Sequence, residues 1–148
     1  MSFRKISDIA KDLKALLVAS DKYQSVKIAT VTSYEQLLKV IPTLTRTPGA
    51  IICVGPGEFG QGMATMQPGL GIVVVDRMIV DLEDQTESVL DALENAIDLI
   101  APGQTEGKPA TPLLISGVSY LADNYRPLAL ANTSQAAYLL EITAHQRR

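Results

Sequence analysis

Tryptophan is absent from the sequence, and cysteine and histidine each occur only once in 148 residues. The lone cysteine, Cys53, cannot form an intrachain disulfide, and together with the single His145 it cannot build a Cys/His metal cluster. Cys53 lies inside the apolar run 50–54, which favours a buried and inert thiol. We therefore expect neither a disulfide framework nor a metal site.

The chain also lacks an excess of basic charge and a long apolar segment. Its formal net charge of -3 gives no positive field that would attract a nucleic acid. Residues 1–5 lead into a stretch of mixed charge, unlike a signal peptide or the roughly 20 apolar residues of a membrane-spanning helix. These absences predict no direct nucleic-acid binding, no membrane partner, and folding in a reducing cytoplasm.

What is present is the composition of a globular protein. Hydrophobic residues make up 47% of the sequence and charged residues 20%, and a chain of this length can bury a full core. We expect residues 1–148 to form one domain.

The first third of the chain predicts two helices and a strand. Apolar residues recur at helical spacing over 6–17, which indicates an amphipathic helix. Residues 26–31 favour a short strand or edge segment. Thr32 and Glu35 have the spacing of a capping box at the start of a short helix over 34–41.

The middle of the chain predicts two strands and the longest helix. The strands cover 50–54 and 71–76, and the continuous apolar character of the second indicates burial on both of its faces. Asp84 and Glu87 stand as a capping pair before a helix whose apolar stripe continues to Ile100.

The last third predicts two more strands, the first over 113–122. In the second, alternation places one set of side chains toward the core and the other toward solvent; the sets are Tyr138, Leu140 and Ile142, and Leu139, Glu141, Thr143 and His145. Three long loops are expected, over 55–70, 101–112 and 123–135. The element order indicates an α+β fold, a mainly antiparallel four-stranded sheet with helices packed on one face.

The segment "GPGEFG" matches the dinucleotide-binding pattern G-x-G-x-x-G through Gly55, Gly57 and Gly60. Asp76 follows at about the distance of a ribose-binding acid. However, the next strand begins too soon for a crossover helix, which the pattern requires. An acidic residue where a strand leaves the core is more often simply solvated, so the nucleotide site is the weaker interpretation.

The same loop supports a second interpretation. Phe59, Met63 and Met66 are flexible apolar side chains on a glycine-rich segment with few charges, which is typical of a surface that meets a partner. Alternatively, the loop folds back and Phe59 covers the edge of its own core. The only histidine, His145, has the position of a solvated surface residue, so we predict no catalytic residues, no cofactor and no enzymatic activity.

The layout resembles the tail terminator and tail-completion proteins of long-tailed bacteriophages, including small tail proteins of Mu-like phages. The resemblance lies in an amphipathic N-terminal helix and in the segments "GAIICVGPGEF", "GLGIVVVDRMIV", "DQTESVLDALENAIDLI", "PLLISGVSYLAD" and "QAAYLLEITAH". It implies an α+β subunit that assembles into a ring, commonly a hexamer, which caps the tail tube and meets the head-completion proteins. Such a protein is expected in the cytoplasm of the host bacterium during assembly and afterwards in the virion tail.

A ring needs head-to-tail interfaces, and the long loops are the natural places to look for them. We expect Phe59, Met63 and Met66 in one loop, and Tyr125 and Arg126 in the 123–135 loop, to contact neighbouring subunits or the tail tube protein. The alternative function is a small-ligand or nucleotide-binding α/β domain that uses the loop 55–62.

Overall fold

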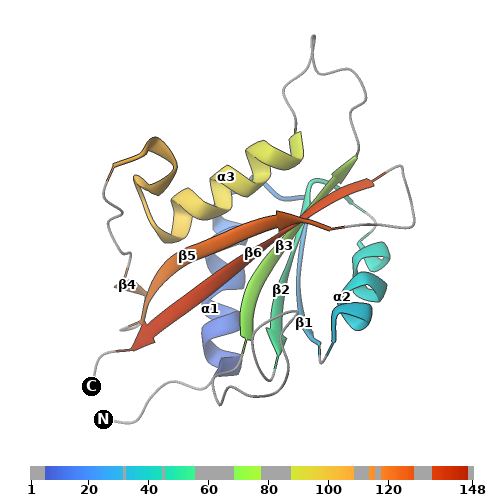
Figure 1. Cartoon of the computed structure of the whole chain (residues 1–148), viewed down its shortest axis with the longest axis horizontal. Helices are drawn as coiled ribbons and strands as arrows, with labels where there is room; N and C mark the ends of the chain where they lie inside the picture. Colours follow the sequence, from blue (N-terminus) through green and yellow to red (C-terminus); the bar gives the residue numbers. More distant parts are fainter. Residues whose placement is uncertain are drawn as a thin grey trace.

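The computed structural model describes residues 6–31, 33–44, 46–55, 69–77, 88–108, 114–115, 118–128 and 135–146. A strongly twisted mixed sheet runs through this part of the chain (Figure 1). Its strands lie in the order β1-β2-β3-β6-β5-β4. They are β1 (Ser25–Thr30), β2 (Gly49–Gly55), β3 (Gly69–Arg77), β4 (Leu114–Ile115), β5 (Val118–Pro127) and β6 (Gln135–Gln146).

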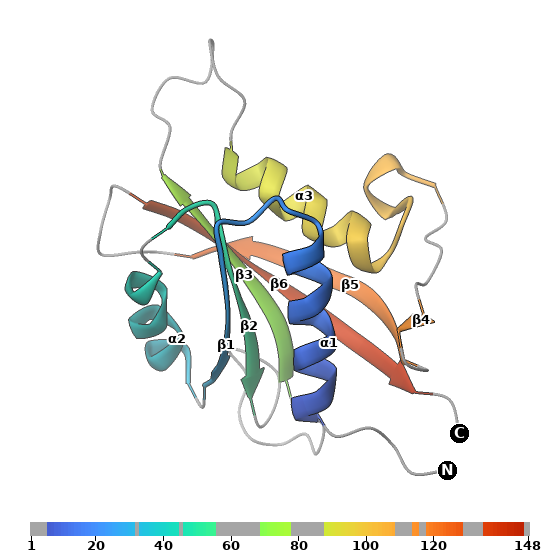
Figure 2. The same ribbon diagram turned by 180° about the vertical axis from the view of Figure 1, so that it is seen from behind.

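Three α-helices and two short 3-10 helices complete the described structure: α1 (Ile6–Ala19), α2 (Tyr34–Val40), η1 (Ile41–Thr43), α3 (Ser88–Ile100) and η2 (Gln104–Glu106). α1 packs against β1 and β2, whereas α3 packs against β3, β6 and β5. Figure 2 shows α1 in front of the sheet, with α3 beside it in the same layer.

The strands β2 and β3 are buried on both faces because helices cover both sides of the sheet. Ile52 and Ile72 point into a core shared with α1 and α3, which we call the α1–α3 face. Their neighbours Ile51 and Val73 point into a second core with Leu37 of α2, which we call the α2 face. The period-two alternation of a strand sends successive side chains to these two separate cores.

The sheet differs from the predicted one in size and in coverage. The α+β class is confirmed, but the sheet has six strands instead of four, and β1 pairs with β2 in parallel. The prediction of helices on one face was wrong, since α2 and η1 cover part of the opposite face. Because both faces of β2 and β3 are covered, both sets of alternating side chains are apolar, which gives continuous apolar runs in the sequence.

Local boundaries differ as well. Ser33, and not Thr32, caps α2, because its side-chain oxygen accepts a hydrogen bond from the Gln36 backbone N–H at 3.2 Å. Leu139 of β6 was expected on the solvent side but is fully buried on the α2 face. Side chains of β6 therefore alternate between the two faces as predicted, but both faces of the strand are buried near Leu139.

The predicted loop over 123–135 was wrong in its first part. β5 continues to Pro127, so Tyr125 and Arg126 are strand residues that pair with Leu140 and Leu139 of β6. The predicted loop over 101–112 contains the 3-10 helix η2 in its described part.

Candidate interaction site

A β-bulge in β5 decides which side chains this strand presents to each face. Ala122 pairs with Ile142 and Asn124 pairs with Glu141, so Asp123 is an extra residue between two consecutive pairs. Strict alternation from Ala122 would place Asn124 on the α1–α3 face. The bulge places Tyr125 there instead.

Tyr125 stands at the rim of that face. Its side chain is 55% exposed, and its ring lies 6.3 Å from that of Tyr138 with a tilt of 59°. Aromatic pairs in tilted arrangements at this separation stabilise each other beyond their buried area. Tyr125 is therefore held in place while much of its ring remains available for another contact.

Beside Tyr125 a cleft of about 390 Å³ opens between α3, η2 and β5. Its lining combines apolar surface with a nearly equal share of polar surface. The apolar side chains are Leu90, Leu93, Ile97, Ala122 and Leu140, and the polar ones include Glu94, Gln104, Thr105 and Asn124. Binding sites commonly combine apolar side chains with convergent polar groups.

Gln104 fixes one wall of the cleft. Its Nε2 donates to the backbone oxygen of Ala122 at 2.7 Å, which ties η2 to β5. Its buried Oε1 has no hydrogen-bond partner among the described residues. Gly103 begins this turn with φ +88°, and its N–H donates to Asp98 Oδ1 at 3.2 Å. Gln104 thus holds η2 against β5, and its Oε1 is enclosed by the protein.

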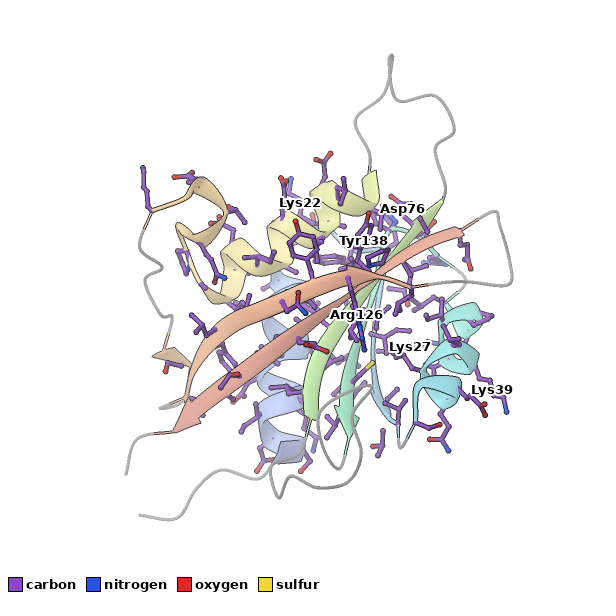
Figure 3. All side chains as sticks on the ribbon, viewed as in Figure 1. Lys22, Lys27, Lys39, Asp76, Arg126 and Tyr138 are labelled. Carbon is purple, nitrogen blue, oxygen red and sulfur yellow. The ribbon has the colours of Figure 1, made fainter. Side chains whose placement is uncertain are left out.

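The opposite side of β5 carries Leu121 and Arg126 on the α2 face. Leu121 pairs with Thr143 and is 39% exposed, beyond the part of this face that the second core occupies. Arg126 is labelled in Figure 3. Its Nη2 lies 3.8 Å from Glu141 Oε1, and both side chains are partly exposed. Such a pair contributes at most about 1 kcal/mol, so it positions Arg126 more than it stabilises the fold.

Of the cofactor residues suggested by the sequence, only Gly55 and Asp76 belong to the described part of the chain, and these two lie far apart. Gly55 pairs with Gly69 in antiparallel β2 and β3, whereas a dinucleotide-binding unit needs parallel strands joined by a helix. Asp76 lies seven residues further along β3, about 23 Å from this end of the strand. Asp76 is also buried, with 5% exposure, and was wrongly expected in solvent.

Several predicted positions lie outside the described residues: Gly57, Phe59, Gly60, Met63, Met66, Asp84 and Glu87. Within the described ranges, no group of three or more His, Cys, Asp or Glu residues could hold a metal ion. No helix in that part of the chain is long and apolar enough to cross a membrane.

Two buried titratable groups are structural. Cys53 is fully buried as expected, and burial raises the pKa of its thiol to about 12. Burial also raises the pKa of Tyr23 to about 12, against the opposing effect of a hydrogen bond from Asn95. Neither group is a nucleophile at neutral pH.

Of the residues around this cleft, only Tyr125 was named from the sequence as a candidate site residue, and its role as an interface residue stays a prediction. The cleft depends on η2, which lies in a segment interpreted as a loop, and on the bulge at Asp123. The signal for the bulge is the break in alternation after Val118, Tyr120 and Ala122. No protein-family model matches the chain, and no curated protein matches it in sequence.

Proposed function

We propose that this chain is a structural subunit that assembles head to tail into a closed ring, and that the ring terminates a phage tail tube. The observation that carries the proposal is the position of the exposed apolar side chains. Among the described residues, four large hydrophobic side chains are exposed: Val18, Ile28, Leu121 and Tyr125. They fall into two groups near opposite edges of the sheet.

The first group lies on the β1 side. Ile28 belongs to β1, the edge strand, and Val18 belongs to α1, which packs over β1 and β2. The second group lies on the other side in β5, beyond which only the two-residue β4 follows. We call these groups the β1-side patch (Val18 and Ile28) and the β5-side patch (Leu121 and Tyr125). The two members of the β5-side patch lie on opposite faces of β5, Leu121 on the α2 face and Tyr125 on the α1–α3 face.

Two different apolar patches at opposite edges suit a heterologous contact, in which one edge of a subunit meets the other edge of the next. A rotation that closes produces a ring from such contacts. A C2 dimer would instead need one self-complementary patch. The resemblance to tail terminator proteins adds the biological setting, with the tail tube protein and the head-completion protein as partners, first in the host cytoplasm and then in the virion.

Native mass in solution tests the proposal. Light scattering over a range of protein concentrations, with negative-stain images of the largest species, should give a single closed ring of several 15.9 kDa chains. A monomer at every concentration, also in the presence of assembled tail tubes, would contradict the proposal. Addition of nucleotides should leave the melting temperature unchanged, because β2 and β3, the described strands on either side of the glycine-rich segment, are antiparallel.

A further inference from the structure

We infer that α1 of one subunit docks on the acidic edge of the cleft between α3 and β5 of the next subunit. The inference rests on the proposed ring and specifies which surfaces meet in it. The occupant of the cleft is thus a second copy of this chain.

The receiving surface is acidic. Asp91, Glu94 and Asp98 are exposed on α3 at spacings of three and four residues, which places them along one stripe of the helix. Glu94 also lines the cleft. This acidic stripe therefore borders the cleft and the exposed ring of Tyr125.

The docking surface has the complementary composition. Lys11, Lys14 and Val18 are exposed on α1 at spacings of three and four residues, so they too share one stripe. Val18, at 56% exposure, is the most exposed large apolar residue of the described chain. A basic and apolar stripe matches an acidic stripe beside a partly apolar cleft in both charge and hydrophobicity.

The positions of the two helices allow the contact to repeat. α1 covers the β1 and β2 part of the sheet, whereas α3 covers β3, β6 and β5. The Tyr23 hydroxyl donates to Ala92 O at 2.6 Å and receives a hydrogen bond from Asn95, which marks the side of α3 toward the α1–β1 connection. Leu90 and Glu94, on the other side of α3, line the cleft. Docking α1 of the next subunit there continues the helical layer from one copy to the next.

Glu94 gives the cleft a specific group for a lysine, because it is exposed and lines the cleft. An ammonium group has three donors and no acceptor, so it pairs with a carboxylate. A lysine of the incoming α1 that reached Glu94 would form an ion pair with it. Val18 would then cover the exposed part of Tyr125.

Charge reversal across the two surfaces tests this arrangement. Glu94→Lys and Lys14→Glu should each raise the concentration of half-assembly by about tenfold or more, and the double variant should return within about threefold of the wild type. Both side chains are exposed, and Glu94→Lys relieves the repulsion from Asp91 and Asp98 within α3. The monomer should therefore remain as stable as before, which thermal unfolding checks.

Matched controls come from α2, on the other face of the sheet. Glu35→Lys and Lys39→Glu make the same charge changes at exposed positions and should leave assembly within about threefold of the wild type. If the wild type forms rings but Glu94→Lys and Lys14→Glu assemble equally well, the α1-to-cleft contact is wrong and the ring proposal stands. If the wild type never assembles, both are wrong.

Discussion

Tyr23 joins segments that lie 69 residues apart in the chain, since its hydroxyl donates to the Ala92 backbone oxygen of α3. Tyr23→Phe should lower the free energy of unfolding by about 1 kcal/mol, because the hydrogen bond is lost and Asn95 Nδ2 loses its acceptor. Urea denaturation at pH 7 measures the effect. Tyr125→Phe is the matched control and should change stability by less than about 0.5 kcal/mol, since Tyr125 is exposed.

Tyr23 also predicts how the free energy of unfolding depends on pH. The folded-state pKa of Tyr23 is raised from 10.0 to about 12, so its contribution to stability is complete below pH 10 and is lost as the pH rises toward 12. Cys53 acts in the same direction from its ordinary 9.0 up to about 12. Stability should therefore fall above pH 9, and the fall between pH 10 and 12 should be smaller in Tyr23→Phe. An equal fall in both proteins would contradict the assignment.

Leu139 and Leu121 lie on the same α2 face but differ in exposure. Leu139 is 0% exposed, and Leu121 is 39% exposed. Leu139→Ala should cost about 2–5 kcal/mol because it leaves a cavity in the second core, whereas Leu121→Ala should cost less than about 1 kcal/mol. Chemical denaturation of both variants tests the difference. Similar losses at the two positions would mean that α2 does not cover this face as described.

At the scale of the element, the bulge in β5 can be tested by deleting its extra residue. Deletion of Asp123 removes the bulge but leaves every other pair of β5 with β6 intact, since Ala122 and Asn124 already face consecutive residues of β6. We expect a folded protein that loses less than about 1.5 kcal/mol. Deletion of Thr143 from β6 is the control, because with β5 held in place it turns part of β6 to the wrong face. Equal damage from the two deletions would contradict the bulge assignment.

Helices and strands were predictable from the sequence where helical spacing or a continuous apolar run was not interrupted. The spacing in 6–17 and the apolar runs at 50–54 and 71–76 led to α1, β2 and β3, and the class α+β followed. The end of β5 was not predictable in the same way, because Asp123 breaks the alternation and resembles the start of a loop. Only the pairing with β6, a contact distant in sequence, keeps residues 124–127 extended.

At the scale of the whole molecule, burial of strand 71–76 on both faces was predicted from the sequence, but the helices were expected on one face only. A run such as Ile72–Val75 has no polar side, so it needs a helix on each face. The candidate site was less accessible, since the cleft needs η2 and the bulged strand to meet. Such a meeting is a property of tertiary packing, and no local pattern encodes it.

The head-to-tail geometry makes a prediction that no symmetric dimer shares. Val18→Ser with Ile28→Ser should disable the β1-side patch, and Leu121→Ser with Tyr125→Ser should disable the β5-side patch. Each double variant alone should stay monomeric, because every contact needs one patch of each kind. A mixture of the two should form dimers of twice 15.9 kDa and nothing larger, since only one intact contact remains between them.

Light scattering of the mixture at the concentration of wild-type assembly measures this outcome. Isologous contacts would behave differently: the variant that keeps the responsible patch would dimerise by itself, and mixing would add nothing. Dimerisation of either variant alone would therefore exclude the ring, whereas a dimer that appears only on mixing would identify the two patches as the two ends of one heterologous interface.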